Sequence, residues 1–160
     1  MDFEPLEFDS TAFDTPAFEP SVDFAILADA AQAIAGKLFL LGGGWDTLRV
    51  STFPARHHTM AIGLRVRIPW TWTGRPMTLS IDLQDEDGGS LFTSGPLRHG
   101  FEVGRPPGAP EGSDIGLVRA FTFNHVPFPS AGGYAFAISL NDVEVDRLRF
   151  NVFQHTRPAE

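Results

Sequence analysis

From about residue 24 onward, apolar and polar residues alternate in short segments that are separated by turn-forming residues. This pattern predicts an all-β fold. The clearest case is near the C-terminus, where residues 134–140 alternate, Asn141-Asp142 forms a turn, and residues 143–152 alternate again. The alternation breaks once, near Asp146-Arg147. We therefore expect a hairpin with one apolar face and a bulge at the break.

Earlier segments follow the same pattern. Further strands are expected at residues 60–68, 79–84, 101–103 and 117–123, the last of them closed by Pro127 and Pro129. Residues 24–35 are rich in alanine and have helical propensity. We favour two strands joined near Ala35-Gly36-Lys37, because residues 37–41 are short, apolar and followed by three glycines. The prediction is one antiparallel β-sandwich, immunoglobulin-like or C2-like, over residues 23–155.

The first 22 residues have a different pattern. Phenylalanines recur every five residues, and each is followed by an acid; the pairs are Phe3-Glu4, Phe8-Asp9, Phe13-Asp14 and Phe18-Glu19. Five residues advance an α-helix by about 140° net, so no apolar stripe forms. In a strand, successive phenylalanines would point to opposite faces. We therefore expect residues 1–22 to be a disordered or extended tail, with a second short tail at residues 156–160.

Three interpretations of the N-terminal tail remain open. It is an idle terminus, or a multivalent linear motif that gains avidity from several weak aromatic contacts, or a segment that adds to a sheet edge. Regular exposed phenylalanines favour a binding role, because exposed aromatic side chains promote association.

Charge is distributed unevenly along the chain. Residues 1–23 hold seven acids and no base, whereas the remaining residues hold 13 acids and 12 bases, so most of the net charge of −8 lies in the tail. A nearly neutral body without a clustered basic surface argues against nucleic acid as a partner. No 18-residue uncharged apolar span occurs, and the N-terminus lacks a basic signal region, so we expect no membrane contact and a cytoplasmic location. The absence of cysteine excludes disulfides, thiolate metal sites and a cysteine nucleophile.

Several strings of the body resemble a known family. They are FAILADAAQ, GKLFLLGGGWD, FPARH, LRVRIPW, FEVGRPPG and VPFPSAGGYAFAISL. Together, over about residues 23–153, the chain resembles a family of small uncharacterised bacterial proteins, a domain of unknown function. The resemblance implies a bacterial β-sandwich and carries no activity, and the phenylalanine tail lies outside it.

No hydrolase, zinc-protease or phosphate-loop motif is present, and we expect no enzyme, no cofactor and no metal. His57-His58 would point to opposite faces of a strand, and we expect them, with His99, His125 and His155, to be surface residues. Asp82, Asp85, Glu86 and Asp87 suggest calcium, but Asp-Gly-Gly is what a hairpin turn needs. Gly42-Gly43-Gly44-Trp45 is interpreted as a tight bend beside a large ring.

Trp70 and Trp72 share a face if the chain there is extended, and Arg105 lies on a stiff Gly-Arg-Pro-Pro-Gly loop. These three residues are the candidate ligand site, an aromatic platform for carbohydrate, although core capping explains the tryptophans more simply. The leading hypothesis is a non-catalytic interaction module. In it, Phe3, Phe8, Phe13 and Phe18 with their acids dock onto a partner protein or a neighbouring copy.

Overall fold

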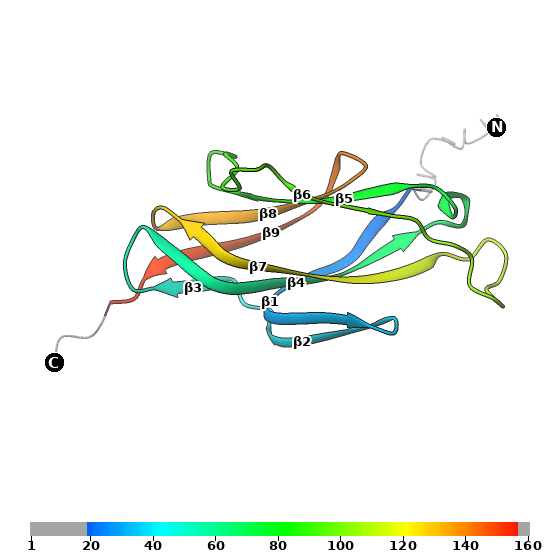
Figure 1. Ribbon diagram of the computed structural model, residues 1–160, viewed down its shortest axis with the longest axis horizontal. Coiled ribbons are helices and arrows are strands. Elements are labelled where there is room, and N and C mark those ends of the chain that lie inside the picture. The colour runs from blue at the N-terminus through cyan, green and yellow to red at the C-terminus, as the bar shows by residue number, and fades with distance from the viewer. Residues whose placement is uncertain (1–18, 157–160) are drawn as a thin grey trace, which may run out of the picture.

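The computed structural model describes residues 19–156, which form two stacked β-sheets (Figure 1). One sheet has the strand order β2-β1-β4-β7, and the other has the order β3-β9-β8-β5-β6. The strands are β1 (Ser21–Ile34), β2 (Lys37–Gly43), β3 (Thr47–Val50), β4 (Ala55–Ile68), β5 (Met77–Gln84), β6 (Leu97–Phe101), β7 (Ile115–Phe128), β8 (Gly132–Leu140) and β9 (Val143–Gln154). The prediction of an all-β, two-sheet architecture is confirmed.

One pair of strands departs from the antiparallel expectation. β3 pairs with β9 in parallel, whereas every other pair among the described strands is antiparallel. The reason is a short crossover. The chain leaves β2 in the first sheet at Gly43 and enters β3 in the second sheet at Thr47, so it arrives running in the same direction as β9.

The core between the sheets comes from the alternating positions that the sequence pattern marked. Met60, Ile62, Leu64, Val66 and Ile68 of β4 are fully buried. They face the buried side chains of the second sheet, which are Leu79, Ile81, Leu83, Phe136, Ile138, Phe150 and Val152. Burying a large aliphatic or aromatic side chain contributes roughly 1.5–3 kcal/mol, so this layer accounts for most of the stability of the fold.

Both predicted hairpins form. Ala35 and Gly36 join β1 to β2 with φ of 51° and 72°, and Asn141 and Asp142 join β8 to β9 with φ of 49° and 66°. Two successive positive φ angles make the turn whose twist suits a two-residue hairpin. The helical alternative for residues 24–35 is therefore wrong. The predicted bulge is also present, at Val145, one residue before the break in the sequence pattern.

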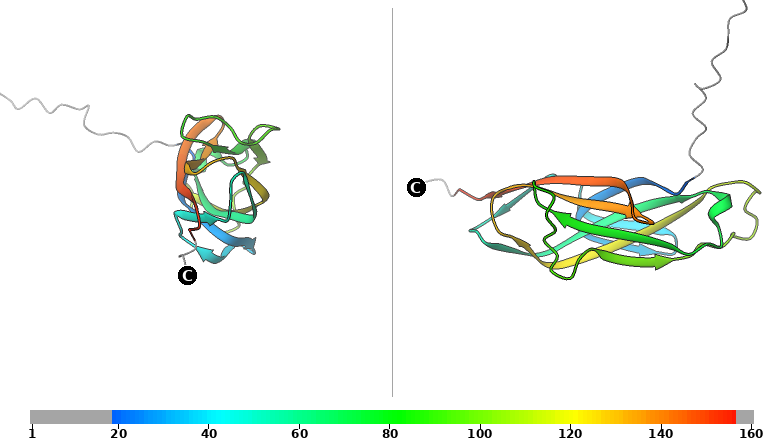
Figure 2. Two further views of the ribbon diagram at one scale, coloured as in Figure 1. Left: turned by 90° about the vertical axis from the view of Figure 1, so that its left-hand side faces the viewer. Right: turned by 90° about the horizontal axis from the view of Figure 1, so that it is seen from above.

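Strand β1 belongs to two ribbons. From Ser21 to Ala28 it pairs with β4, and from Ala28 to Ile34 it pairs with β2. After Ala28 the β1–β2 hairpin turns away from the sandwich and lies across its outer surface as a partial third layer (Figures 1 and 2). At Gly63 of β4, an added Cβ would lie 2.7 Å from Leu40 Cδ2. The hairpin therefore seats on the outer face of β4, where only a glycine leaves room.

Strand β7 is longer than the sequence indicated. It continues through Pro127 to Phe128, whereas the predicted strand ran to Phe123 with Pro127 and Pro129 closing it. Proline is tolerated because β7 is the last strand of its sheet, and a strand at an edge has no ladder partner on its outer side. At His125 the φ angle is 54°. The buried side chain before this residue is at an odd-numbered position, Phe123, whereas those after it are at even-numbered positions, Val126 and Phe128.

Candidate functional site

The first candidate surface is the outward side of the β1–β2 hairpin. Residues paired across two strands share a face, and the register pairs Ile34 with Lys37, Gln32 with Phe39, and Ala30 with Leu41. This face is turned away from β4. Ile34 and Phe39 are each 54% exposed and Leu41 is 73% exposed, so three large apolar side chains stand next to one another in solvent.

The hairpin surface also includes a strand edge and a groove. β2 is the terminal strand of its sheet, so its outer backbone N–H and C=O groups lack ladder partners among the described strands. A groove of about 730 Å³ runs beside it, lined by the hairpin together with Thr59 of β4 and Thr122 of β7. An apolar face beside an open edge is what a protein partner recognises, by packing and by strand addition.

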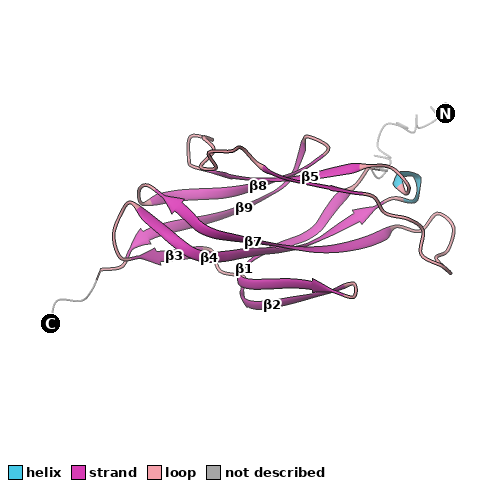
Figure 3. Cartoon of the chain, in the orientation of Figure 1, coloured by secondary structure: helices cyan, strands magenta, loops and turns pink. Residues whose placement is uncertain are grey.

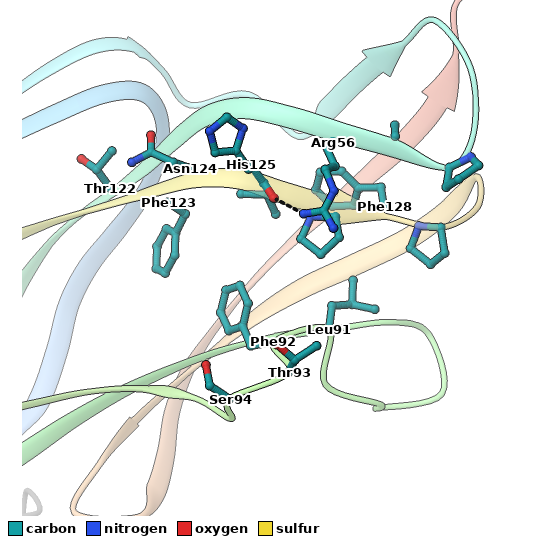
Figure 4. Close-up of a pocket in the computed structure, with 15 residues that line it drawn as sticks. Arg56, Leu91, Phe92, Thr93, Ser94, Thr122, Phe123, Asn124, His125 and Phe128 are labelled. Atoms are coloured by element: carbon teal, nitrogen blue, oxygen red, sulfur yellow. Dashed lines mark hydrogen bonds between the residues drawn. The ribbon is translucent and has the colours of Figure 1, made fainter.

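The second candidate surface is a cleft of about 960 Å³ at the open side of the sandwich (Figure 4). One wall is the edge strand β7 from Thr122 onward, with Arg56 of β4 beside it. The opposite wall is the loop of residues 91–94, which follows β5 (Figure 4). Phe92 of this loop stacks on Phe123 of β7 with ring centroids 5.6 Å apart.

Charge in this cleft is of one sign. Arg56 is the charged residue among the described residues that line it, and none of them is acidic. Arg56 Nη1 donates a long hydrogen bond of 3.4 Å to the carbonyl oxygen of His125. The described part of the chain contains no carboxylate within salt-bridge distance of Arg56. The guanidinium group therefore keeps donors that an acidic ligand would satisfy.

The turn of residues 85–90, which leads into the loop wall of residues 91–94, is held by carboxylates. Asp85 Oδ1 accepts hydrogen bonds from the backbone N–H of Asp87 at 3.0 Å and of Gly89 at 2.8 Å. Asp82 Oδ1 accepts from the hydroxyl of Ser90 at 2.5 Å, and Glu86 Oε1 accepts from the N–H of Gly133 at 2.6 Å. These acids stabilise the turn, in agreement with the interpretation of the Asp-Gly-Gly sequence as a hairpin turn.

The histidines do not converge on one site. His58 and His125 meet edge to face with ring centroids 5.5 Å apart, while His99 packs against Phe101 and Phe121. Within residues 19–156, no group of three or more His, Cys, Asp or Glu side chains is placed to hold a metal ion. Burial lowers the pKa of His57, which is opposed by its backbone hydrogen bond at Thr59.

The predicted platform residues are brought together, but in a different geometry. Trp70–Trp72 forms a short 3-10 helix (Figure 3) rather than extended chain. The alternation that would place both rings on one face therefore does not apply. The Arg105 guanidinium stacks on Trp70 at 4.1 Å and its Nε donates to Thr73 Oγ1 at 2.9 Å. Arg75 lies over Trp72 at 5.2 Å. Protein cations thus occupy one face of each ring.

The glycine-rich string behaves as a bend. Gly42 and Gly44 have φ of 59° and 86°, and an added Cβ at Gly42 would collide with the carboxylate of Asp29. Trp45 follows and packs edge to face on Phe150 with ring centroids 6.0 Å apart. The interpretation as a tight turn beside a large ring is confirmed.

The residues predicted to bind a partner, Phe3, Phe8, Phe13 and Phe18 with Glu4, Asp9 and Asp14, lie outside the described residues; Glu19 is the first residue described.

The sequence analysis predicted neither the hairpin surface nor the cleft. The two apolar faces of residues 38–41 were a usable signal for the first surface. The cleft has no local signal, because its walls come from three separate segments.

Comparison with known proteins gives one match. A family model described as a family of unknown function (DUF6941) matches residues 23–153. The chain belongs to this family. The match covers the span over which the sequence resembled an uncharacterised domain, and that prediction is confirmed. No curated protein matches the chain. None of the described helical segments is long and apolar enough to cross a membrane.

Proposed function

We propose that this protein is a non-catalytic protein-interaction module. The sandwich serves as a rigid scaffold, and the phenylalanine-acid segment of residues 3–19 docks onto a partner protein or a neighbouring copy. A cytoplasmic location and an immunoglobulin-like or C2-like sandwich belong to the same proposal. The proposal is supported first by the hairpin surface. Ile34, Phe39 and Leu41 are exposed by half or more on a strand edge.

The physical argument is the free energy that the chain forgoes by leaving the apolar side chains of the hairpin surface in water. Leaving a large apolar side chain in water forgoes roughly 1.5–3 kcal/mol of burial, and three adjacent ones create an association hazard. Edge strands in stable monomers are usually protected by charge, proline or a bulge. β2 carries one charge, Lys37, and no proline. A surface of this kind is consistent with a partner that covers it.

The test compares matched variants of the full chain. The first variant carries Phe39→Ser and Leu41→Ser, and the second replaces Phe3, Phe8, Phe13 and Phe18 with Ala. The control is Val143→Ser, because Val143 is 63% exposed but lies on the opposite sheet. Mass by light scattering over a concentration series and quantitative capture of interacting proteins are compared with wild type. We expect both variants to lose association and the control to keep it. Unchanged mass and unchanged partners in both variants would refute the proposal.

A second candidate is a ligand-binding sandwich that uses Trp70, Trp72 and Arg105 for carbohydrate. The observation in its favour is that Arg105 and Trp70 are in contact. The short 3-10 helix that contains Trp70 lies at the end of the molecule where β1 starts (Figure 3). Because guanidinium groups cover one face of each ring, an acidic sugar suits this cluster better than a neutral one. Tryptophan fluorescence is titrated with neutral and acidic glycans. An unchanged spectrum across both sets eliminates this function.

A further inference from the structure

We infer that the cleft between β7 and residues 91–94 binds one phenylalanine-acid unit of a second copy of this chain. The inference rests on the proposed function only in taking these units as the binding element, and it assigns them a receptor. The occupant is thus residues 3–19 of a neighbouring protomer, one unit to each cleft.

Charge complementarity is the first argument. The segment of residues 1–23 holds seven acids and no base. The cleft is lined by Arg56 and by no acid among its described residues, in a chain whose net charge is −8. Charge-assisted hydrogen bonds to a carboxylate are roughly twice as strong as neutral ones, and arginine can make two in parallel.

The shape and apolar lining of the cleft are the second argument. Leu91 and Phe92 form the loop wall, and Arg56 lies on the opposite wall (Figure 4). In an extended peptide, consecutive side chains point in opposite directions. A phenylalanine directed at Phe92 therefore places the following acid toward Arg56. Every unit in the segment has this order, with the acid directly after the ring.

The backbone of β7 supplies the third argument. Residues 122–129 all line the cleft, and β7 is the outermost strand of its sheet in the described chain. An extended segment can add through main-chain hydrogen bonds to residues 122–124 of this edge, which precede the positive φ of His125 and Pro127. Because the units are five residues apart, the next phenylalanine points to the other face. One cleft therefore takes one unit and leaves the others for further copies.

For the Phe18 unit, which lies nearest to the sandwich, geometry requires a second copy rather than the same chain. Ser21, where β1 starts, pairs with Arg67, whereas Phe123 of the cleft pairs with Met60. Met60 and Arg67 are separated by about 23 Å along the strand. Three residues of extended chain, from Phe18 to Ser21, span only about 10 Å. Phe18 therefore cannot reach its own cleft and can enter only that of a neighbouring copy, whereas Phe13, eight residues before Ser21, could span about 26 Å.

The experiment is complementation between two full-length variants. The cleft variant is Arg56→Glu, and the segment variant replaces Phe3, Phe8, Phe13 and Phe18 with Ala. Arg56 is exposed, so its substitution leaves the core intact; Arg149→Glu, an exposed arginine outside the cleft, is the matched control for charge. Light scattering of the mixture is expected to show complexes that contain both variants, while each variant alone stays monomeric. No mixed complex would overturn the inference.

A direct binding measurement separates this inference from the proposed function. A synthetic peptide of residues 1–19 is titrated into the segment variant while amide shifts are recorded. We expect shifts at residues 91–94 and 122–128, affinity lower by roughly tenfold or more in Arg56→Glu, and no loss in Arg149→Glu. Shifts on the β1–β2 hairpin instead, with equal affinity in both arginine variants, would overturn the cleft assignment and leave the interaction module standing. Absence of peptide binding, with partners and mass unaffected by the phenylalanine substitutions, would remove both.

Discussion

Replacing Gly63 with valine tests whether the β1–β2 hairpin is seated on β4. At this position an added Cβ would lie 2.7 Å from Leu40 Cδ2 and 2.9 Å from Leu38 Cδ2, closer than real side chains approach. Valine then adds two further methyl groups. Leu38 and Leu40 must therefore move, and they carry the hairpin away from the outer face.

The expected cost follows from these contacts. Leu38 and Leu40 are half-buried, so each loses roughly half of the 1.5–3 kcal/mol that full burial of a leucine provides. Overpacking of a well-packed site costs about 1–3 kcal/mol. The strand propensity of valine over glycine returns up to about 1 kcal/mol. We expect a net loss of about 3 kcal/mol, which for a chain of this size lowers the Tm by roughly 6–12 °C.

The matched control is Gly100→Val in β6. Gly100 is also a strand glycine, but it is exposed and nothing lies within 4 Å of its added Cβ. Valine there gains propensity without a clash, so the free energy of unfolding is expected to be unchanged or slightly higher. Urea unfolding followed by tryptophan fluorescence measures both variants. Adding Leu40→Ala to Gly63→Val should restore part of the loss, because the two residues share one space. Equal stability of Gly63→Val and Gly100→Val would refute the seating of the hairpin.

Three further predictions use other parts of the fold. Burial lowers the pKa of His57 below 6.5, so the folded state favours the neutral ring; its contribution to stability is present above pH 6.5 and is lost as the pH falls through the folded pKa. His57→Gln should flatten the pH dependence of the urea midpoint below pH 6.5, and a dependence identical to wild type would contradict this. Tyr134→Phe removes a hydrogen bond of 2.5 Å to the carbonyl of Ser130 and should cost about 1 kcal/mol of unfolding free energy, whereas an unchanged urea midpoint would count against it. Arg105→Leu uncovers one face of Trp70 and should shift the tryptophan emission while lowering stability by about 0.5–1 kcal/mol, and an emission spectrum that does not move would argue against the stacking.

Local patterns in the sequence predicted the parts of the fold that depend on nearest neighbours. Residue spacing and turn chemistry predict four of these features. They are the Ala35-Gly36 turn, the Asn141-Asp142 turn, the buried face of β4 and the bulge near Asp146. These features are determined by side-chain alternation and by the φ angles that a two-residue turn requires.

Features that depend on distant segments were not predicted. The small residues Thr59, Ala61 and Gly63 resemble a solvent-facing side of β4 in sequence. In the structure Ala61 and Gly63 are buried, and Leu38 and Leu40 of the hairpin lie over Gly63. Likewise, Pro127 looked like the end of a strand, and only the position of β7 at the sheet edge explains why the strand continues. The candidate cleft needs three segments to come together, which no local pattern encodes.

The two ribbons to which β1 belongs form at very different sequence separations. Ile34 and Lys37 are neighbours across a two-residue turn, whereas Ser21 must find Arg67 much later in the chain. A hairpin closes in about 1–10 μs, and the long-range pairing of a sandwich takes about milliseconds to seconds. During that interval both apolar faces of the β1–β2 hairpin are exposed to water, because the sheet on which it packs has not yet formed. Aggregation during synthesis or refolding should therefore begin at residues 30–41, and slower expression at low temperature should improve the yield of native protein.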